Sequence, residues 1–256
     1  MNRQLRRADD WRAALQPALV DWLFRRRVVS TVLNREHVLC IGDSHVQVLR
    51  HVSMPGVWFR VKSIEGATAS GLPNPKSKTG AQQAFARALG RARPWQQVLV
   101  QLGEVDCGFV IWYRAARHGL SVEEQFTQTI GSYEAFIARI AGMGFHRTIV
   151  LSVPLPTISD DGAKWGKVAR LRESVTASQA ERTRLTARFN AELNERCRAL
   201  GASFVDVTTG HTDHATGLVA SRFVRESDDH HLADAPYAEL ISSRLAALWG
   251  AAGQED

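Results

Sequence analysis

The chain has 256 residues, of which 45% are hydrophobic and 23% are charged, close to an average soluble globular protein. This composition excludes disordered, collagenous and fibrous proteins, and a mean hydropathy of −0.19 without a long apolar run excludes a polytopic membrane protein. Lys and Arg outnumber Asp and Glu by 32 to 26, a net charge of +6, which suits anionic partners such as nucleic acid, an anionic membrane surface or an acidic glycan.

Residues 1–34 are predicted to form a helical extension that precedes the main domain. The segment is rich in arginine: Arg3, Arg6, Arg7, Arg12, Arg25, Arg26 and Arg27. Its apolar stretch, residues 13–24, contains polar residues and Pro17 and lacks a small-residue cleavage site, so a secretory signal is not indicated. The arginines suit either a solvated helix face or peripheral contact with a membrane or anionic partner. Because the three cysteines show no C-x-x-C spacing, neither a disulfide framework nor a zinc ribbon is indicated, and we expect a cytoplasmic protein.

Strands and helices alternate along the rest of the chain. Five short apolar segments predict buried strands at residues 37–42, 57–61, 97–103, 148–153 and 203–207. Helices are predicted at residues 44–51, 81–91, 122–141, 178–200 and 235–249. This order predicts an α/β fold over residues 35–250, a three-layer α/β/α sandwich with a parallel sheet of about five strands, followed by a tail at 251–256. In such sheets ligands bind outside the carboxyl ends of the strands.

The first chemical candidate is the segment Gly42-Asp43-Ser44-His45, which follows the first predicted strand directly. Ser44 would open the next helix at the mouth of the sheet, where backbone N–H groups and the helix dipole favour a developing oxyanion. The structural alternative is a turn in which Asp43 or Ser44 caps the helix.

The second candidate is Asp228-Asp229-His230-His231-Leu232, which precedes the last predicted helix. A serine nucleophile needs a base, and the base needs an acceptor that holds its tautomer. Asp228 and His231, three residues apart, can both point into one cleft from one loop. The alternative is a solvated acidic loop in which Asp229 caps the helix.

Glycines follow the second and third predicted strands. Gly66, with Gly71 in reserve, can bring a backbone N–H close to a substrate. Gly103 begins the segment Gly103-Glu104-Val105-Asp106, where Gly103 allows close approach and the acidic residues serve substrate binding or loop structure. For Asp106, packing at the strand mouth is the simpler interpretation.

These four segments, in this order, resemble the SGNH hydrolase superfamily, also called the GDSL esterases and lipases, over about residues 37–249. The resemblance implies Ser44 as nucleophile, Asp228 as orienting acid and His231 as base. It also implies an oxyanion hole from the N–H groups of Ser44 and Gly66.

Two positions depart from the family pattern. The third block of the family reads Gly-x-Asn-Asp, but Val105 stands where the Asn side chain would donate. Loss of one oxyanion donor can lower the rate on the order of 100–1000-fold. The first block reads GDSH instead of GDSL, so His45 is an unusual polar neighbour of the nucleophile. Asp43 and His45 are further candidates for substrate binding.

The resemblance implies a hydrolase that cleaves small acyl esters, for example acetyl esters on a carbohydrate, through an acyl-enzyme. It implies no cofactor and no metal, and no nucleic-acid partner is expected. Three alternatives stay open: an O-acyltransferase with the same triad, a glycan- or protein-binding module of the same fold, and a metal-dependent phosphoesterase. Ligands for the last would come from Asp43, His45, His211, Asp213, His214, Asp229 and His230.

Overall fold

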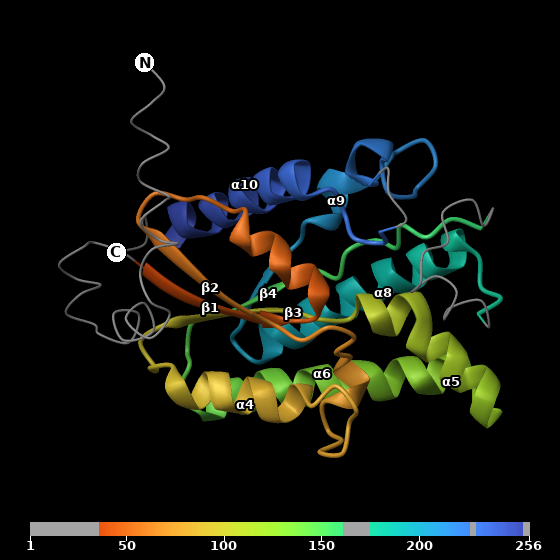
Figure 1. Cartoon of the computed structure of the whole chain (residues 1–256), viewed down its shortest axis with the longest axis horizontal. Coiled ribbons are helices and arrows are strands. Elements are labelled where there is room, and N and C mark those ends of the chain that lie inside the picture. Colours follow the sequence, from red (N-terminus) through yellow and green to blue (C-terminus); the bar gives the residue numbers. More distant parts are fainter. Residues whose placement is uncertain (1–35, 161–174, 226–228, 253–256) are drawn as a thin grey trace.

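A computed structural model describes residues 36–160, 175–225 and 229–252 (Figure 1). The predicted N-terminal extension, residues 1–34, therefore lies outside the described residues. Residues 251 and 252, assigned to the predicted tail, continue the last helix. No helix in the described ranges combines the length and the hydropathy needed to cross a membrane.

The centre of the molecule is a sheet of five parallel strands, which confirms the predicted fold class. The strands are β1 (Glu36–Gly42), β2 (Val57–Ser63), β3 (Gln97–Gln101), β4 (Thr148–Leu151) and β5 (Ser203–Val205). Their spatial order is β2-β1-β3-β4-β5. The chain moves outward from β1 to β2 and then crosses to β3 on the other side of β1. The order thus reverses between β1 and β3, which is where ligands bind in open α/β sheets.

Helices cover both faces of the sheet (Figure 1). On one face lie α4 (Ala81–Arg91), α6 (Val122–Gly142) and α8 (Gln179–Ala199); on the other lie the 3₁₀ helix η1 (Ser44–Arg50) and α10 (Asp234–Ala252). The alternation of side chains along β1 supports both layers: Leu39 and Ile41 pack in the first core and Val38 and Cys40 in the second. Strands buried on both faces explain the continuous apolar runs in the sequence.

The helices α6 and α8 begin as their sequences predict. Each has a serine N-cap and a glutamate three residues later that complete a capping box, Ser121 with Glu124 and Ser178 with Glu181. The segment that follows β3 was not predicted to be helical. It forms a π-helical turn, η3 (Asp106–Val110), which continues into α5 (Ile111–His118). Its β-branched residues and Gly108 have low helix propensity, so local sequence gives little signal there.

The remaining elements are short. They are η2 (Ala69–Gly71) after β2, α9 (Thr208–His211) after β5, and η4 (Ser221–Phe223).

The packing of β1 against β3 sets the point at which the first loop leaves the sheet. A Cβ atom added at Gly42 would lie 2.0 Å from the carbonyl oxygen of Gln101, so glycine is required at this crossing. The N–H of Asp43 then donates to the same carbonyl at 3.2 Å. Ser44 consequently starts η1 at the carboxyl edge of the sheet.

Candidate active site

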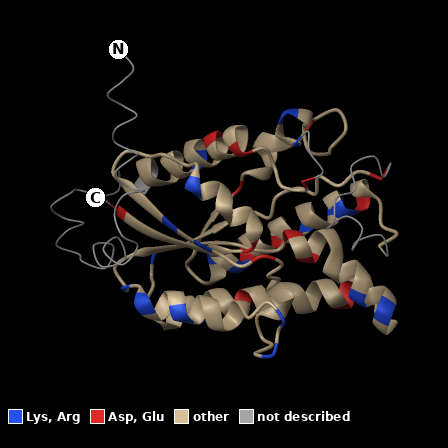
Figure 2. Cartoon of the chain, in the orientation of Figure 1, with Lys and Arg blue, Asp and Glu red and all other residues tan. Residues whose placement is uncertain are grey.

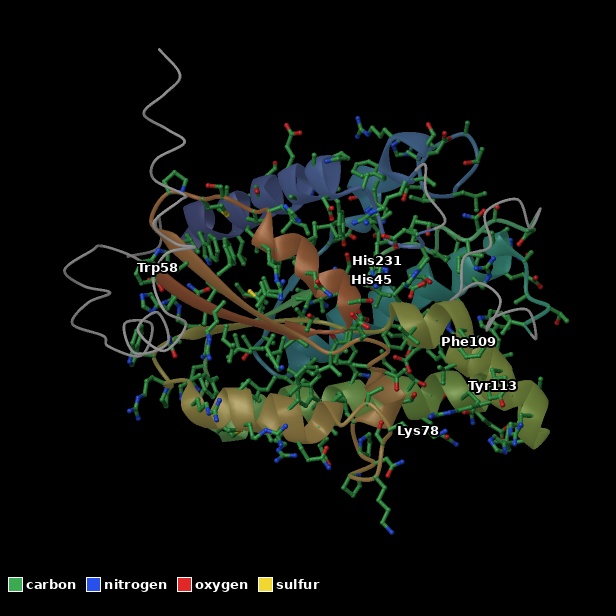
Figure 3. All side chains as sticks on the ribbon, in the orientation of Figure 1. His45, Trp58, Lys78, Phe109, Tyr113 and His231 are labelled. Atoms are coloured by element: carbon green, nitrogen blue, oxygen red, sulfur yellow. The ribbon has the colours of Figure 1, made fainter. Side chains whose placement is uncertain are left out.

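A cavity of about 450 Å³ lies between η1 and the loop that leads into α10. Its lining includes Ser44, His45, Arg225, Asp229, His231 and Tyr237. The structure therefore brings the predicted nucleophile Ser44 and the predicted base His231 to one cavity, although they are far apart in sequence. Figure 3 shows the labelled side chains of His45 and His231 next to each other at this place.

Asp43 sets the conformation of the loop that carries Ser44. It is the N-cap of η1 and is almost fully buried; its Oδ1 accepts from the backbone N–H of His45 at 2.8 Å. The same oxygen lies 3.1 Å from Nδ1 of His45. The turn that caps η1 is thus the turn that carries Ser44. Ser44 is partly exposed at the cavity, whereas Asp43 and His45 on either side of it are buried.

The carboxylate that contacts His231 is that of Asp229. Its Oδ1 lies 2.5 Å from Nδ1 of His231 and also accepts from the His231 backbone N–H at 3.0 Å. A carboxylate accepts hydrogen bonds, so Nδ1 carries the hydrogen and Nε2 keeps its lone pair. This Nε2 atom is buried and has no hydrogen-bond partner among the described residues. Asp228, predicted for the orienting role, lies outside the described residues.

Arg225 holds the loop of Asp229 in place. Its guanidinium forms ion pairs with Asp229 and, at 2.7 Å, with Asp234, and its Nε donates to the carbonyl of Leu232 at 3.0 Å. These three contacts span the segment that carries His231. Arg225 could not be predicted from the sequence, because an arginine six residues from a histidine forms no recognisable motif.

The surroundings of Asp229 and His231 lower the pKa of both groups. Partial burial opposes ionisation of Asp229, but the hydrogen bonds from His231 and the charge of Arg225 outweigh it and lower the pKa to about 2. Burial, together with the neighbouring His45, lowers the pKa of His231, against the opposing effect of Asp229. Asp229 is therefore ionised and His231 neutral at pH 7, as a general base must be.

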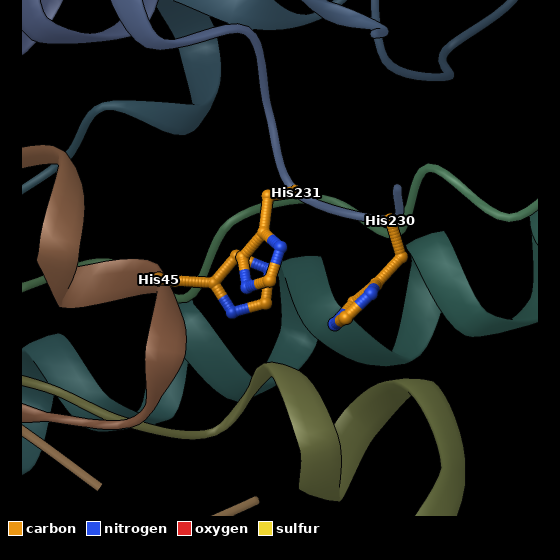
Figure 4. A group of neighbouring side chains, drawn as sticks. All are labelled: His45, His230 and His231. Atoms are coloured by element: carbon orange, nitrogen blue, oxygen red, sulfur yellow. The ribbon is translucent and has the colours of Figure 1, made fainter. Parts of the chain in front are cut away.

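The imidazole rings of His45, His230 and His231 meet in one cluster (Figure 4). The ring centroid of His45 lies 4.6 Å from that of His231 and 5.5 Å from that of His230. The centroids of His230 and His231 are 4.2 Å apart. One ligand atom from each of the three rings lies within 4.8 Å of the others.

The second and third blocks meet through Asp106. Its buried carboxylate accepts from the backbone N–H of Ala69 at 2.7 Å, and from the N–H and Oγ of Ser70 at 3.2 and 2.7 Å. Burial raises the pKa of this carboxyl even though these hydrogen bonds oppose the shift. Asp106 thus ties η2, which follows Gly66, to the start of η3, in agreement with its simpler interpretation as a packing residue.

Three other positions from the predicted blocks are not among the residues that line this cavity. Gly66 is exposed in the turn after β2, and Gly103, with a φ of 116°, ends β3 where a Cβ atom would contact Val153 at 2.8 Å. Val105 is partly exposed at the start of η3. The structure gives no hydrogen bond from these residues into the cavity.

The ligand set considered for a phosphoesterase is brought together only in part: His45 and His230 belong to the histidine cluster, whereas His211, Asp213 and His214 do not. His211 is fully buried, its Nδ1 donates to the carbonyl of Val207 at 2.8 Å, and its Nε2 accepts from the N–H of Leu155 at 3.2 Å. Both ring nitrogens are therefore used in the fold. Asp213 and His214 join no group of metal-ligand type within the described ranges.

Comparison with known proteins places the fold. No protein-family model and no curated protein matches the chain. Among solved structures, a proposed acylhydrolase from Bacteroides fragilis aligns with a TM-score of 0.53 at 12% identity, over 86% of this chain and 91% of the other. A proposed platelet activating factor from Streptococcus pneumonia aligns with a TM-score of 0.53 at 18% identity, over 90% and 96%. A GDSL-like lipase from Bacteroides thetaiotaomicron aligns with a TM-score of 0.50 at 14% sequence identity, over 97% of this chain and 98% of the lipase.

These alignments cover most of this chain and nearly all of each solved structure, so the likeness concerns the whole architecture. The chain therefore shares the fold of these solved structures, one of which is named a GDSL-like lipase. The resemblance found in the sequence is thereby confirmed for the fold.

Proposed function

We propose that the protein is a serine esterase with Ser44 as nucleophile and His231 as general base. One observation carries the proposal: Asp229 holds Nδ1 of His231 and leaves the buried Nε2 without a partner in the cavity that Ser44 lines. A serine, a neutral imidazole and an ionised carboxylate in one cavity are the parts that acyl transfer needs.

In this mechanism Ser44 Oγ attacks the ester carbonyl carbon and His231 Nε2 takes its proton. Asp229 stabilises the imidazolium that forms, and His231 then gives the proton to the leaving alcohol. Water attacks the acyl-enzyme with the same base and releases the acid. We assign the oxyanion to the backbone N–H groups of Ser44 and Gly66; Val105 cannot donate from its side chain.

We further propose small acyl esters, with acetyl esters of carbohydrates as the first class to test. A cavity of about 450 Å³ is in the range of small-molecule sites and accepts a short acyl group with part of its alcohol. The names of the aligned structures, an acylhydrolase and a GDSL-like lipase, agree with ester chemistry. Transfer of the acyl group to an alcohol would use the same acyl-enzyme, so a sugar acceptor belongs in the same assay.

The test is hydrolysis of 4-nitrophenyl acetate and butyrate by wild type, Ser44→Ala and His231→Ala. Both variants should lose on the order of 10⁴-fold or more in kcat. Ser63→Ala, at the carboxyl end of the neighbouring strand β2, is the matched control and should stay close to wild type. Thermal unfolding checks that all three variants are folded. Appreciable turnover left in a folded Ser44→Ala or His231→Ala would contradict the assignment.

A further inference from the structure

His45, His230 and His231 form a histidine cluster, and a serine esterase needs only one of these imidazoles as its base. His45 comes from η1, and the other two come from the loop before α10 (Figure 4). Within the described part of the chain, these residues form the one group whose His, Cys, Asp or Glu ligand atoms could converge on a metal ion, all within 4.8 Å of one another. The proposed esterase mechanism uses only His231.

Two of the three rings are oriented by carboxylates at the same ring atom. Asp43 accepts from Nδ1 of His45 at 3.1 Å, and Asp229 accepts from Nδ1 of His231 at 2.5 Å. This is the arrangement by which proteins orient metal-binding histidines, since the outer carboxylate fixes the tautomer and makes the other nitrogen more basic. Nε2 is then the metal-binding atom of both rings, and Nε2 of His231 is buried without a hydrogen-bond partner.

We propose that His45, His230 and His231 bind one divalent transition-metal ion of the Zn²⁺ type, and that this ion blocks the esterase reversibly. Imidazole ligands favour Zn²⁺, Ni²⁺ and Cu²⁺ over Mg²⁺ and Ca²⁺. The inhibitory part rests on the proposed function, because the ion would occupy the lone pair of His231 with which the base must deprotonate Ser44.

The geometry requires only a small closure of the cluster. Zn–N bonds of about 2.0–2.1 Å put two ligand nitrogens of a tetrahedral site roughly 3.4 Å apart. The side chains of His230 and His231 are 13% and 25% exposed, whereas that of His45 is 3% exposed. Movement of the two loop histidines toward His45 would complete three ligands, with water in the fourth position.

The test is metal binding to the full-length protein, independent of activity. After treatment with EDTA and dialysis, the protein is titrated with Zn²⁺ by calorimetry and with Co²⁺ by visible absorption. We expect one equivalent to bind and tetrahedral Co²⁺ bands to appear. His230→Ala should weaken binding at least tenfold, whereas His214→Ala, an exposed histidine outside the cluster, should not. No saturable binding by folded wild type, or equal binding by His230→Ala, would overturn the site.

Two further measurements separate the metal site from the esterase. Ser44→Ala should bind the ion as wild type does, so a failed esterase assignment leaves the metal test intact. In wild type, Zn²⁺ should slow labelling by a fluorophosphonate probe at least tenfold, and EDTA should restore the rate. Binding that leaves labelling unchanged, or accelerates it, would overturn the inhibitory role.

Discussion

In a neutral imidazole, an acceptor at one ring nitrogen fixes the hydrogen there and leaves the lone pair on the other nitrogen. His231 and His211 both have such an acceptor at Nδ1, but their Nε2 atoms differ. In His231 the carboxylate of Asp229 takes Nδ1 and leaves Nε2 unbonded in the cavity. In His211 the carbonyl of Val207 takes Nδ1 and the N–H of Leu155 takes Nε2, so no atom remains. The first ring keeps a lone pair for the base role that we propose, whereas both nitrogens of the second ring are bonded within the fold.

The residue that orients His231 can be identified by comparing two neighbouring aspartates. Asp229→Asn would replace the acceptor at Nδ1 by a group that can donate, which favours the wrong tautomer. We expect kcat to fall on the order of 10³–10⁴-fold. Asp228→Asn, assayed in parallel, should lose far less. The measurement is kcat of both variants at pH 7.5. A larger loss of kcat in Asp228→Asn would show that Asp228, the residue predicted from the sequence, orients His231.

Ser44 and His231, both chosen from the sequence, line one cavity, and their roles stay predictions. The motif Asp-x-x-His favours Asp228, which lies outside the described residues, and the contact that the structure describes comes from Asp229. Spacing alone cannot separate adjacent aspartates, because the choice depends on the φ/ψ path of a short loop. Arg225, which has no place in the motif, contacts Asp229, Leu232 and Asp234 on either side of His231.

At the scale of elements, the site depends on loops that are tied to one another across the sheet edge. Asp106 joins the start of η3 to η2 through three hydrogen bonds. The loop containing Gly66, our proposed oxyanion donor, leads directly into η2. A change at Asp106 should therefore affect stability and activity together.

Asp106→Ala removes all three hydrogen bonds and leaves the buried N–H of Ala69 and the partly buried donors of Ser70 without an acceptor. We expect the free energy of unfolding to fall by about 2–4 kcal/mol. The matched control is Asp213→Ala, which also removes acceptors of two backbone N–H groups, but in an exposed loop, and should cost less than about 1 kcal/mol. Urea unfolding measures both. Equal losses would show that the Asp106 contacts do not hold the loop.

Element prediction succeeded where local sequence and tertiary packing agree. The five strands and the helices α4, α6, α8 and α10 lie within a few residues of their expected bounds. Two differences have physical reasons. The helix expected at 44–51 is 3₁₀ instead of α, in a short segment held by the Asp43 cap. The helical run from η3 to α5 was missed, because packing against α6 and α8 overrides the weak propensity of its residues.

At the scale of the whole molecule, the positive charge is concentrated at one end of the sequence. Residues 1–35 contain eight arginines and three acidic residues, whereas the remaining chain is nearly neutral. Figure 2 shows acidic and basic residues mixed along the helices of the described chain. Most of the net positive charge therefore belongs to residues outside the described structure. The sheet order also belongs to this scale, since the sequence predicts parallel strands but not which strands are neighbours.

Global stability should depend on pH through His211. Burial lowers the pKa of this imidazole from 6.5 to about 4 in the folded protein. Between those values the unfolded chain binds a proton that the folded chain does not, so stability is complete above pH 6.5 and declines as the pH falls toward 4. The full loss is on the order of 3 kcal/mol.

Denaturant unfolding at pH 7.5, 6.0 and 5.0 checks this, with His211→Gln as the comparison. The variant should be less stable at pH 7.5 and should show a smaller decline toward pH 5.0. A decline equal to that of wild type would assign the pH dependence to other groups.

If Ser44 is the activated nucleophile that we propose, a fluorophosphonate probe will label it, and intact-mass analysis detects the adduct. The probe needs an activated serine and no knowledge of the substrate. We expect one adduct on metal-free wild type and on Ser63→Ala, and none on Ser44→Ala or His231→Ala. An unlabelled, folded wild-type protein, or an adduct that persists in Ser44→Ala, would contradict the assignment of this cavity as a serine esterase site.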